Sequence, residues 1–148
     1  MTKSTGFMPE PGSFARRRTD TVLLVDDYAD ARATLRDLLE DHGHPVIEAA
    51  NGQQALNILV SQSAYRIGLI VLDLQMPVMD GRQFINLLRN YVRLANIPVL
   101  VVSGHTGQLS ESERSRIVGC LQQPYDPKEL LGVVNAYVAP ATPPPRSA

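Results

Sequence analysis

The sequence predicts one α/β domain in which a five-stranded parallel sheet lies between two layers of helices. Short apolar runs alternate five times with amphipathic stretches between residues 20 and 138. The stronger runs are apolar throughout, as in parallel strands that are buried on both faces. The connections between parallel strands are right-handed, which leaves few topologies. A length of 148 residues and a hydrophobic content of 44% suit a single domain with one core.

The first half of this alternation contains three of the strands and two of the helices. The strands are expected as apolar runs at residues 22–25, 46–49 and 69–72. A helix is expected at residues 29–42, and Gly43 is its stop because glycine tolerates the left-handed conformation that ends helices. The apolar face of this helix consists of Ala31, Leu35, Leu38 and Leu39. Asn51 and Gln54 resemble the capping box of a second helix that runs to about Ser63.

The second half contains the other two strands, expected at residues 99–102 and 118–122. A third helix precedes them, and its apolar face is expected to consist of Phe84, Leu87, Leu88 and Tyr91. Pro98 opens the fourth strand, where proline costs no ladder hydrogen bond. Ser110 and Glu113 indicate the cap of a short fourth helix. The last helix has Asp126 as its cap and Pro127 at its first position, and its core face is expected to be Leu130, Val134, Tyr137 and Val138.

The two ends of the chain differ in composition from the domain, which is expected to span residues 20–138. Residues 1–19 are rich in Gly, Pro, Ser and Thr and are interpreted as a flexible leader, and the proline-rich residues 139–148 as a disordered tail. No apolar run is long enough for a signal peptide or a membrane span. A single cysteine cannot form an internal disulfide, and the formal net charge is −1. We therefore expect a cytoplasmic protein that binds neither membranes nor nucleic acid.

Acidic and hydroxyl side chains follow three of the expected strands. Asp26 and Asp27 come after the first strand, Asp73 after the third and Ser103 after the fourth. Ligands bind at the carboxyl ends of the strands in an open parallel sheet. Such residues often act only as turn formers and helix caps, but four of them on three strand ends favour a site. Carboxylates crowded together repel one another unless a cation neutralises them, and Mg²⁺ is the usual cation beside a phosphate.

The same residues suggest phosphoryl chemistry. An aspartate can attack phosphorus and form an acyl phosphate. Transfer of a phosphoryl group then depends mainly on positioning and on neutralisation of charge. Asp73 is the candidate nucleophile, because its strand is expected between the strand that carries the two neighbouring acids and the strand that ends in Ser103.

Four segments make the chain similar to the receiver domains of response regulators: residues 22–27 (VLLVDD), 70–81 (IVLDLQMPVMDG), 98–104 (PVLVVSG) and 124–131 (PYDPKELL). The similarity covers roughly residues 20 to 138, and the central segment is the most specific. It implies a flavodoxin-like sheet with strand order 2-1-3-4-5.

The resemblance also implies roles for individual residues. Asp73 corresponds to the phosphorylated aspartate and Ser103 to the hydroxyl that bonds the phosphoryl group. The implied Mg²⁺ ligands are Asp27, Asp26 (through water), Asp73 and the backbone carbonyl of Gln75.

Two positions depart from the family pattern. Gln123 stands immediately before Pro124, where the family has a lysine, and neutral hydrogen bonds are weaker than charge-assisted ones by about 1–2 kcal/mol. Cys120 stands where the family usually has an aromatic side chain that moves on phosphorylation, and is interpreted here as a small apolar residue. We therefore expect a weaker response to phosphorylation. The resemblance also implies a cis peptide bond between Gln123 and Pro124.

The expected function is that of a stand-alone receiver that takes a phosphoryl group from a histidine kinase or a phosphotransfer protein. It is expected to act through protein contacts of about residues 108–138 rather than as an enzyme, and a homodimer is possible. One alternative is a degenerate receiver that binds a partner without phosphorylation, which Gln123 and Cys120 favour. Another is a phosphatase with an aspartyl nucleophile, but such enzymes have a second aspartate where this chain has Gln75.

Overall fold

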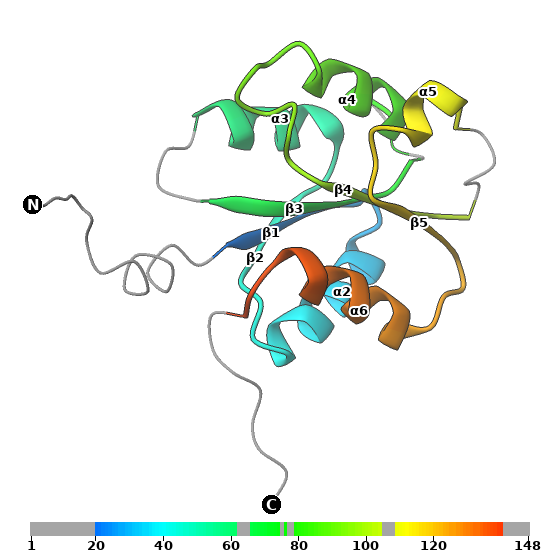
Figure 1. The fold of residues 1–148 in the computed structure, drawn as a ribbon. Coiled ribbons are helices and arrows are strands. Elements are labelled where there is room, and N and C mark those ends of the chain that lie inside the picture. Colours follow the sequence, from blue (N-terminus) through cyan, green and yellow to red (C-terminus); the bar gives the residue numbers. More distant parts are fainter. Residues whose placement is uncertain (1–19, 62–65, 75, 77–78, 105–108, 141–148) are drawn as a thin grey trace, which may run out of the picture.

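A computed structural model describes residues 20–61, 66–74, 76, 79–104 and 109–140. The strands are β1 (Thr21–Val25), β2 (Val46–Ala49), β3 (Ile67–Leu72), β4 (Val99–Ser103) and β5 (Gly119–Gln122). The helices are α2 (Ala29–Asp41), α3 (Gly52–Ser61), α4 (Gly81–Leu88), α5 (Glu111–Arg114) and α6 (Pro127–Tyr137). Helices α3, α4 and α5 lie on one face of the sheet, and α2 and α6 lie on the other (Figure 1).

The sheet has the order β2-β1-β3-β4-β5, and every neighbouring pair is parallel. The predicted fold class and strand order are therefore confirmed. Val25 at the end of β1 pairs with Ala49 and with Leu72, so β1, β2 and β3 end at the same level. Ser103 pairs with Gln122 at the corresponding end of β4 and β5. This alignment brings the segments that follow the strands to one edge of the sheet.

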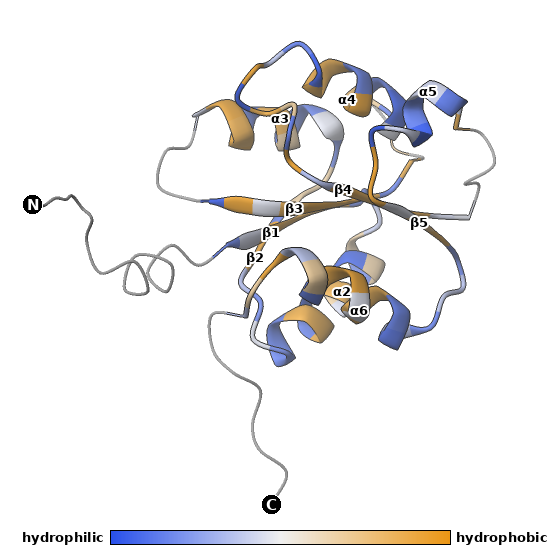
Figure 2. Ribbon diagram, viewed as in Figure 1, coloured by the Kyte–Doolittle hydropathy of each residue, from blue (hydrophilic) through white to orange (hydrophobic). Residues whose placement is uncertain are grey.

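Apolar strand residues pack alternately against the two layers of helices. Leu23 and Val25 of β1 face the cluster formed with α3 and α4, whereas Val22 and Leu24 face the cluster formed with α2 and α6. Strand β1 is buried along its whole length, which agrees with the continuous apolar run in its sequence. Figure 2 shows hydrophobic residues along the central strands and hydrophilic residues in many of the loops that follow the elements. Each buried Val or Leu side chain stabilises the fold by about 1.5–3 kcal/mol.

The buried face of α4 differs from the predicted one. Gly81, Phe84, Ile85 and Leu88 are its buried residues. Leu87 is only partly buried, and Tyr91 lies beyond the helix with 39% of its surface exposed. The helix begins at Gly81 with the capping box of Asp80 and Gln83 and ends at Leu88, so the helical period no longer applies at Tyr91.

Other boundaries differ by a few residues. Helix α3 is described to Ser61, and the predicted end at Ser63 lies outside the described residues, as do the predicted leader and most of the predicted tail. Helix α6 buries Leu130 and Val134, and Val138 is buried just after it. The prediction for Tyr137 was wrong, because this residue at the end of α6 is 43% exposed. Within the described part of the chain, no helix is both long and apolar enough to cross a membrane.

Candidate acidic site

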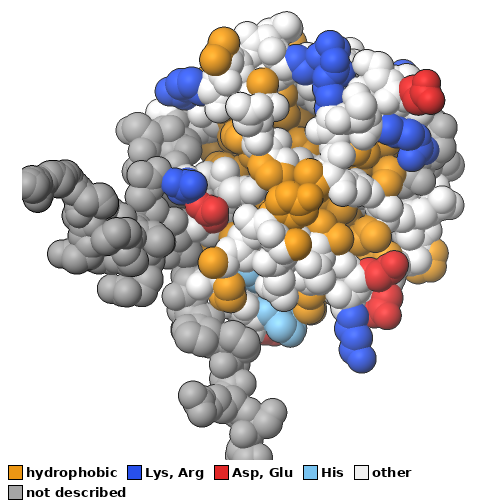
Figure 3. Space-filling view, viewed as in Figure 1, with side chains coloured by type: hydrophobic (Ala, Val, Ile, Leu, Met, Phe, Trp, Pro, Cys, Tyr) orange, Lys and Arg blue, Asp and Glu red, His pale blue; other side chains and the backbone are white. Residues whose placement is uncertain are grey.

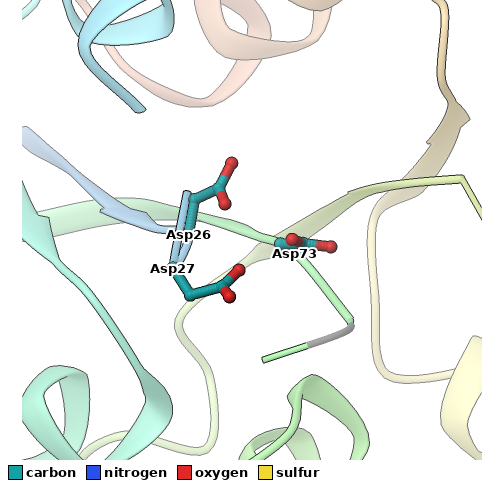
Figure 4. A group of neighbouring side chains, drawn as sticks. All are labelled: Asp26, Asp27 and Asp73. Carbon is teal, nitrogen blue, oxygen red and sulfur yellow. The ribbon is translucent and has the colours of Figure 1, made fainter. Parts of the chain in front are cut away.

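The structure brings three aspartates together at the carboxyl edge of the sheet. Asp26 and Asp27 follow β1, and Asp73 follows β3, which is its neighbour. The backbone amide of Asp26 donates to Ala49 O at 3.1 Å, and that of Asp73 donates to Val25 O at 3.0 Å. These bonds continue the sheet by one residue and fix both chain segments. One carboxylate oxygen of each aspartate lies within 4.8 Å of the others, and all three side chains project into the same region (Figure 4).

The three carboxylates differ in their exposure. Asp26 is buried, Asp73 is partly buried and Asp27 is exposed. Burial raises the pKa of the Asp26 carboxyl, whereas the backbone N–H of Tyr28, which donates to its Oδ1 at 2.9 Å, lowers it. The charge of Asp27 raises this pKa further. Asp26 and Asp27 therefore repel each other in a partly buried place, and a bound cation would relieve this repulsion.

This donor set fits Mg²⁺. It consists of carboxylate oxygens, which a hard cation prefers, and it leaves open positions for water and for a phosphoryl oxygen. Asp26, Asp27 and Asp73 are three of the four ligands expected from the sequence. The fourth, the backbone carbonyl of Gln75, lies outside the described residues.

Arg32 supports the acidic loop from helix α2. Its guanidinium donates to the backbone carbonyl of Asp26 at 2.7 Å and to Glu48 Oε1 of β2 at 2.9 Å. The side chain thus ties the end of β1 to its neighbouring strand. The sequence does not predict this role, because nothing in the spacing of Arg32 shows that it contacts a carbonyl.

Ser103 is the last residue of β4, next to β3 in the sheet. It is 1% exposed, and its carbonyl accepts a hydrogen bond from the backbone N–H of Gln123 at 3.0 Å. Leu72 pairs with Val101, so Asp73 and Ser103 lie at the same end of adjacent strands. The predicted hydroxyl therefore lies at the edge of the sheet that carries the acids.

Gln123 reaches the same region from the end of β5. A small cavity of about 30 Å³ is lined by Asp26, Asp73, Gln123 and Tyr125, together with apolar residues of β1, β3, β4 and α2. The Gln123–Pro124 peptide bond is cis, as predicted. The residue that replaces the family's lysine therefore borders the acidic cluster and can offer it an amide N–H.

Tyr125 is a residue of the site that the sequence analysis did not identify. Its side chain is half-buried and lines the cavity with Asp26. Burial raises the pKa of the Tyr125 hydroxyl, and the charge of Asp26 acts in the same direction. The available signal was an aromatic residue directly after Pro124, but a sequence does not show on which side of the loop the ring lies.

The turn after Asp73 depends on close packing by Gly81. Its amide donates to Leu74 O at 2.8 Å, and a Cβ at this position would lie 2.7 Å from Asp73 O. Any other residue would therefore push against the backbone that carries Asp73. Pro77, which belongs to the same sequence motif, lies outside the described residues.

Cys120 lies in the middle of β5, where it pairs with Val101. It is partly buried and packs against the apolar cluster formed with α3 and α4. This packing agrees with its interpretation as a small apolar residue.

Comparisons with known proteins match this chain to one family. A family model described as the response regulator receiver domain matches residues 22–135. Protein PilG of Pseudomonas aeruginosa is 34% identical over 125 residues, which cover 82% of this chain and 90% of PilG. Sporulation initiation phosphotransferase F of Bacillus subtilis is 30% identical over 122 residues, which cover 80% of this chain and 94% of that protein. The chain spans only about half the length of two other relatives that it matches.

A solved structure agrees with this match. The receiver protein of a response regulator from Pseudomonas putida has a TM-score of 0.69 and is 32% identical. The alignment covers 80% of this chain and 97% of that protein.

Proposed function

Because the chain belongs to the response regulator receiver family, we propose that it accepts a phosphoryl group on Asp73 from a histidine kinase or a phosphotransfer protein. The observation that carries the proposal is the cluster of Asp26, Asp27 and Asp73, whose oxygens lie within 4.8 Å of one another. Asp73 is the partly buried member and follows the central strand β3. Its position beside both the acids of β1 and the serine of β4 supports the role of nucleophile.

The proposed reaction is a transfer between two side chains. A carboxylate oxygen of Asp73 attacks the phosphorus of a phosphohistidine, and the bond between phosphorus and the imidazole nitrogen breaks. The electron pair of that bond stays on the imidazole nitrogen, which then takes a proton. The product is an acyl phosphate on Asp73, and the Ser103 hydroxyl donates a hydrogen bond to one of its oxygens.

We propose Mg²⁺ as the cofactor of this step, held by Asp26, Asp27, Asp73 and the carbonyl of Gln75. When bound, it would neutralise negative charge on the phosphoryl oxygens and on the carboxylates. Arg32 supports this proposal, because its bond to the Asp26 carbonyl holds the backbone of one proposed ligand in place. The raised pKa of Asp26 supports a site that gains stability from a cation.

Gln123 and Cys120 support a weak conformational response to phosphorylation. Gln123 borders the cavity with a neutral amide, so it offers the phosphoryl group a bond without charge assistance. Cys120 is too small to replace a moving aromatic ring. We propose that phosphorylation occurs but shifts the conformation less than in a receiver that has both usual residues.

The proposed output is contact with a protein partner through about residues 108–138, in the cytoplasm, without enzymatic turnover and without nucleic acid or membrane binding. These residues include α5, β5 and α6, which form one edge of the sheet and its neighbouring helices (Figure 1). A homodimer through this region is one form that such contact can take.

A second candidate function is binding of a partner without phosphorylation, which Gln123 at the lysine position favours. The two candidates differ in their response to Asp73→Asn. If this variant binds the partner as tightly as the wild type under phosphorylating conditions, the phosphorylation-independent function is the correct one.

The proposed chemistry can be tested with phosphoramidate, a small donor with a nitrogen–phosphorus bond. We expect the intact mass to increase by one phosphoryl group in Mg²⁺ but not in EDTA. Asp27→Asn should lower the labelled fraction strongly, whereas Asp30→Asn, which removes a nearby acid in the first turn of α2, should not. Equal labelling of all three proteins with and without Mg²⁺ would contradict the proposed cofactor.

A further inference from the structure

A second concave surface lies away from the acidic cluster. This groove of about 600 Å³ lies at the amino end of β4, where the chain enters the sheet from α4. Its lining comes from three parts of the chain: the segment after α4, the connection from α5 to β5, and the end of α6. The lining residues are Arg89, Ala95, Asn96, Ile97, Pro98, Ser115, Arg116, Val118 and Tyr137. The aspartates lie at the opposite ends of the strands, so the groove is a separate site.

The groove has an apolar centre and a basic rim. Ile97, Pro98 and Val118 supply apolar surface, and Tyr137, which also lines the groove, is 43% exposed. In the view of Figure 3, hydrophobic side chains gather in the middle of the molecule, and basic side chains lie above them. No residue in the lining carries a carboxyl group. The chemistry of the lining is therefore suited to a ligand that is anionic and partly apolar.

The two arginines of the rim, Arg89 and Arg116, form no ion pair with any residue that the structure describes. The ion pairs of the described part of the chain use Arg32, Arg36, Arg66 and Arg82. Arg89 and Arg116 take part in none of them. Arg116 is held in place by bonds from its Nη1 to Ser112 O at 3.3 Å and to Ser112 Oγ at 3.2 Å. Within the part of the chain that the structure describes, the other N–H groups of Arg116 remain available for a ligand.

We propose that this groove binds a nucleotide. Guanidinium groups bind phosphate oxygens in a bidentate manner, and the amide of Asn96 adds a neutral donor. A base is a flat ring that stacks well on an aromatic side chain such as Tyr137. The volume lies within the range of about 300–1,000 Å³ that is typical of small-molecule sites. A phosphate alone would use the basic rim but leave the apolar centre exposed.

The proposal is tested by titrating the full-length ¹⁵N-labelled chain with ATP in EDTA, followed by NMR. We expect saturable shifts of the amide signals around Arg89, Arg116 and Tyr137. The double variant Arg89→Gln with Arg116→Gln should weaken ATP binding by about tenfold or more. Tyr137→Leu should weaken it by about fivefold or more, because the stacking surface is lost. Arg93→Gln is the matched control, since it removes the same charge from an exposed position outside the lining.

Two further ligands distinguish nucleotide binding from binding of phosphate alone and from binding of an acidic protein segment. Inorganic phosphate should bind more weakly than ATP, and equal affinities would overturn the role of the apolar centre. A hexaglutamate peptide tests the alternative ligand, an acidic protein segment. If this peptide binds to the groove and ATP does not, the proposal of a nucleotide is overturned. Absence of saturation with ATP up to about 5 mM, or equal affinities of the wild type and the double arginine variant, would also overturn it.

Discussion

At the scale of single residues, the protein combines a complete acidic cluster with a neutral neighbour. Asp26, Asp27 and Asp73 each place a carboxylate oxygen within 4.8 Å of the other two, and Ser103 lies at the end of the adjacent strand. Gln123 borders the same cavity but brings no charge. In the proposed function, attraction to the phosphoryl group would therefore depend on Mg²⁺ and on neutral donors.

The variant Gln123→Lys tests this interpretation. A lysine at this position would replace a neutral hydrogen bond by a charge-assisted one, which is stronger by about 1–2 kcal/mol. We expect about a tenfold faster phosphorylation by a small phosphodonor in Mg²⁺, measured by intact mass over time. Gln122→Lys adds the same charge one residue earlier, outside the cavity lining, and should change the rate far less. Equal acceleration by both variants would indicate a general effect of net charge.

At the scale of elements, the turn between Asp73 and α4 is held by close contact of backbone with backbone. A Cβ on Gly81 would lie 2.6 Å from Leu74 Cα and 2.7 Å from Asp73 O. These neighbours are main-chain atoms and cannot rotate away. The start of α4 and the position of Asp73 are therefore coupled.

We expect Gly81→Ala to destabilise the fold by about 1–3 kcal/mol in urea unfolding and to weaken Mg²⁺ binding measured by calorimetry. Gly132→Ala is the control, because a Cβ there meets no atom within 4 Å and the residue lies inside α6. That variant should stabilise by about 0.5–1 kcal/mol and leave Mg²⁺ binding unchanged. Unchanged stability and Mg²⁺ affinity in Gly81→Ala would contradict the coupling.

Helices α4 and α5 are joined by a buried acid. Glu113 is 5% exposed and accepts hydrogen bonds from Arg82 Nε and Asn86 Nδ2, each at 3.1 Å, and from the backbone N–H of Ser110 at 2.9 Å. The Ser110 bond, followed by those of Asn86 and Arg82, lowers the pKa of Glu113 to about 2, although burial opposes the shift. The ionised form is thus the form that stabilises the fold.

This pKa predicts a pH dependence of stability. The contribution of Glu113 should be complete above about pH 4.5, its ordinary pKa, and should be lost as the pH falls towards 2. Glu113→Gln should cost on the order of 1–2 kcal/mol at pH 7 in urea unfolding, because Arg82 is partly exposed and its charge is screened. The difference between the variant and the wild type should shrink between pH 4.5 and 2. A difference that is constant over this window would rule out the proposed ionisation.

At the scale of the whole molecule, the sheet was the part that the sequence predicted best. Continuous apolar runs predicted the strands, and the family resemblance implied their order in the sheet. The errors fell on helix surfaces: Tyr91 and Tyr137 were expected in the core but are exposed. Both are amphipathic residues at or beyond the end of a helix, where the helical period no longer determines which side chain faces the sheet.

The acidic site was predictable because its residues follow strands directly, and parallel strands end at one edge. The roles of Arg32 and Tyr125 were not predictable from the sequence, because both depend on where a side chain lies relative to a loop in the folded structure. The groove around Arg89 and Arg116 was also missed. Its residues come from three separate parts of the chain, and only the folded structure brings them together.

The central claim is that Asp73 is phosphorylated although the usual lysine is absent. The most direct measurement is peptide-resolved mass spectrometry of the chain after incubation with Mg²⁺ and a small phosphodonor. We expect one phosphoryl group, located on the peptide that contains Asp73 and absent from Asp73→Asn. Absence of this modification in the wild type, or an equal modification of Asp73→Asn at another residue, would contradict the account.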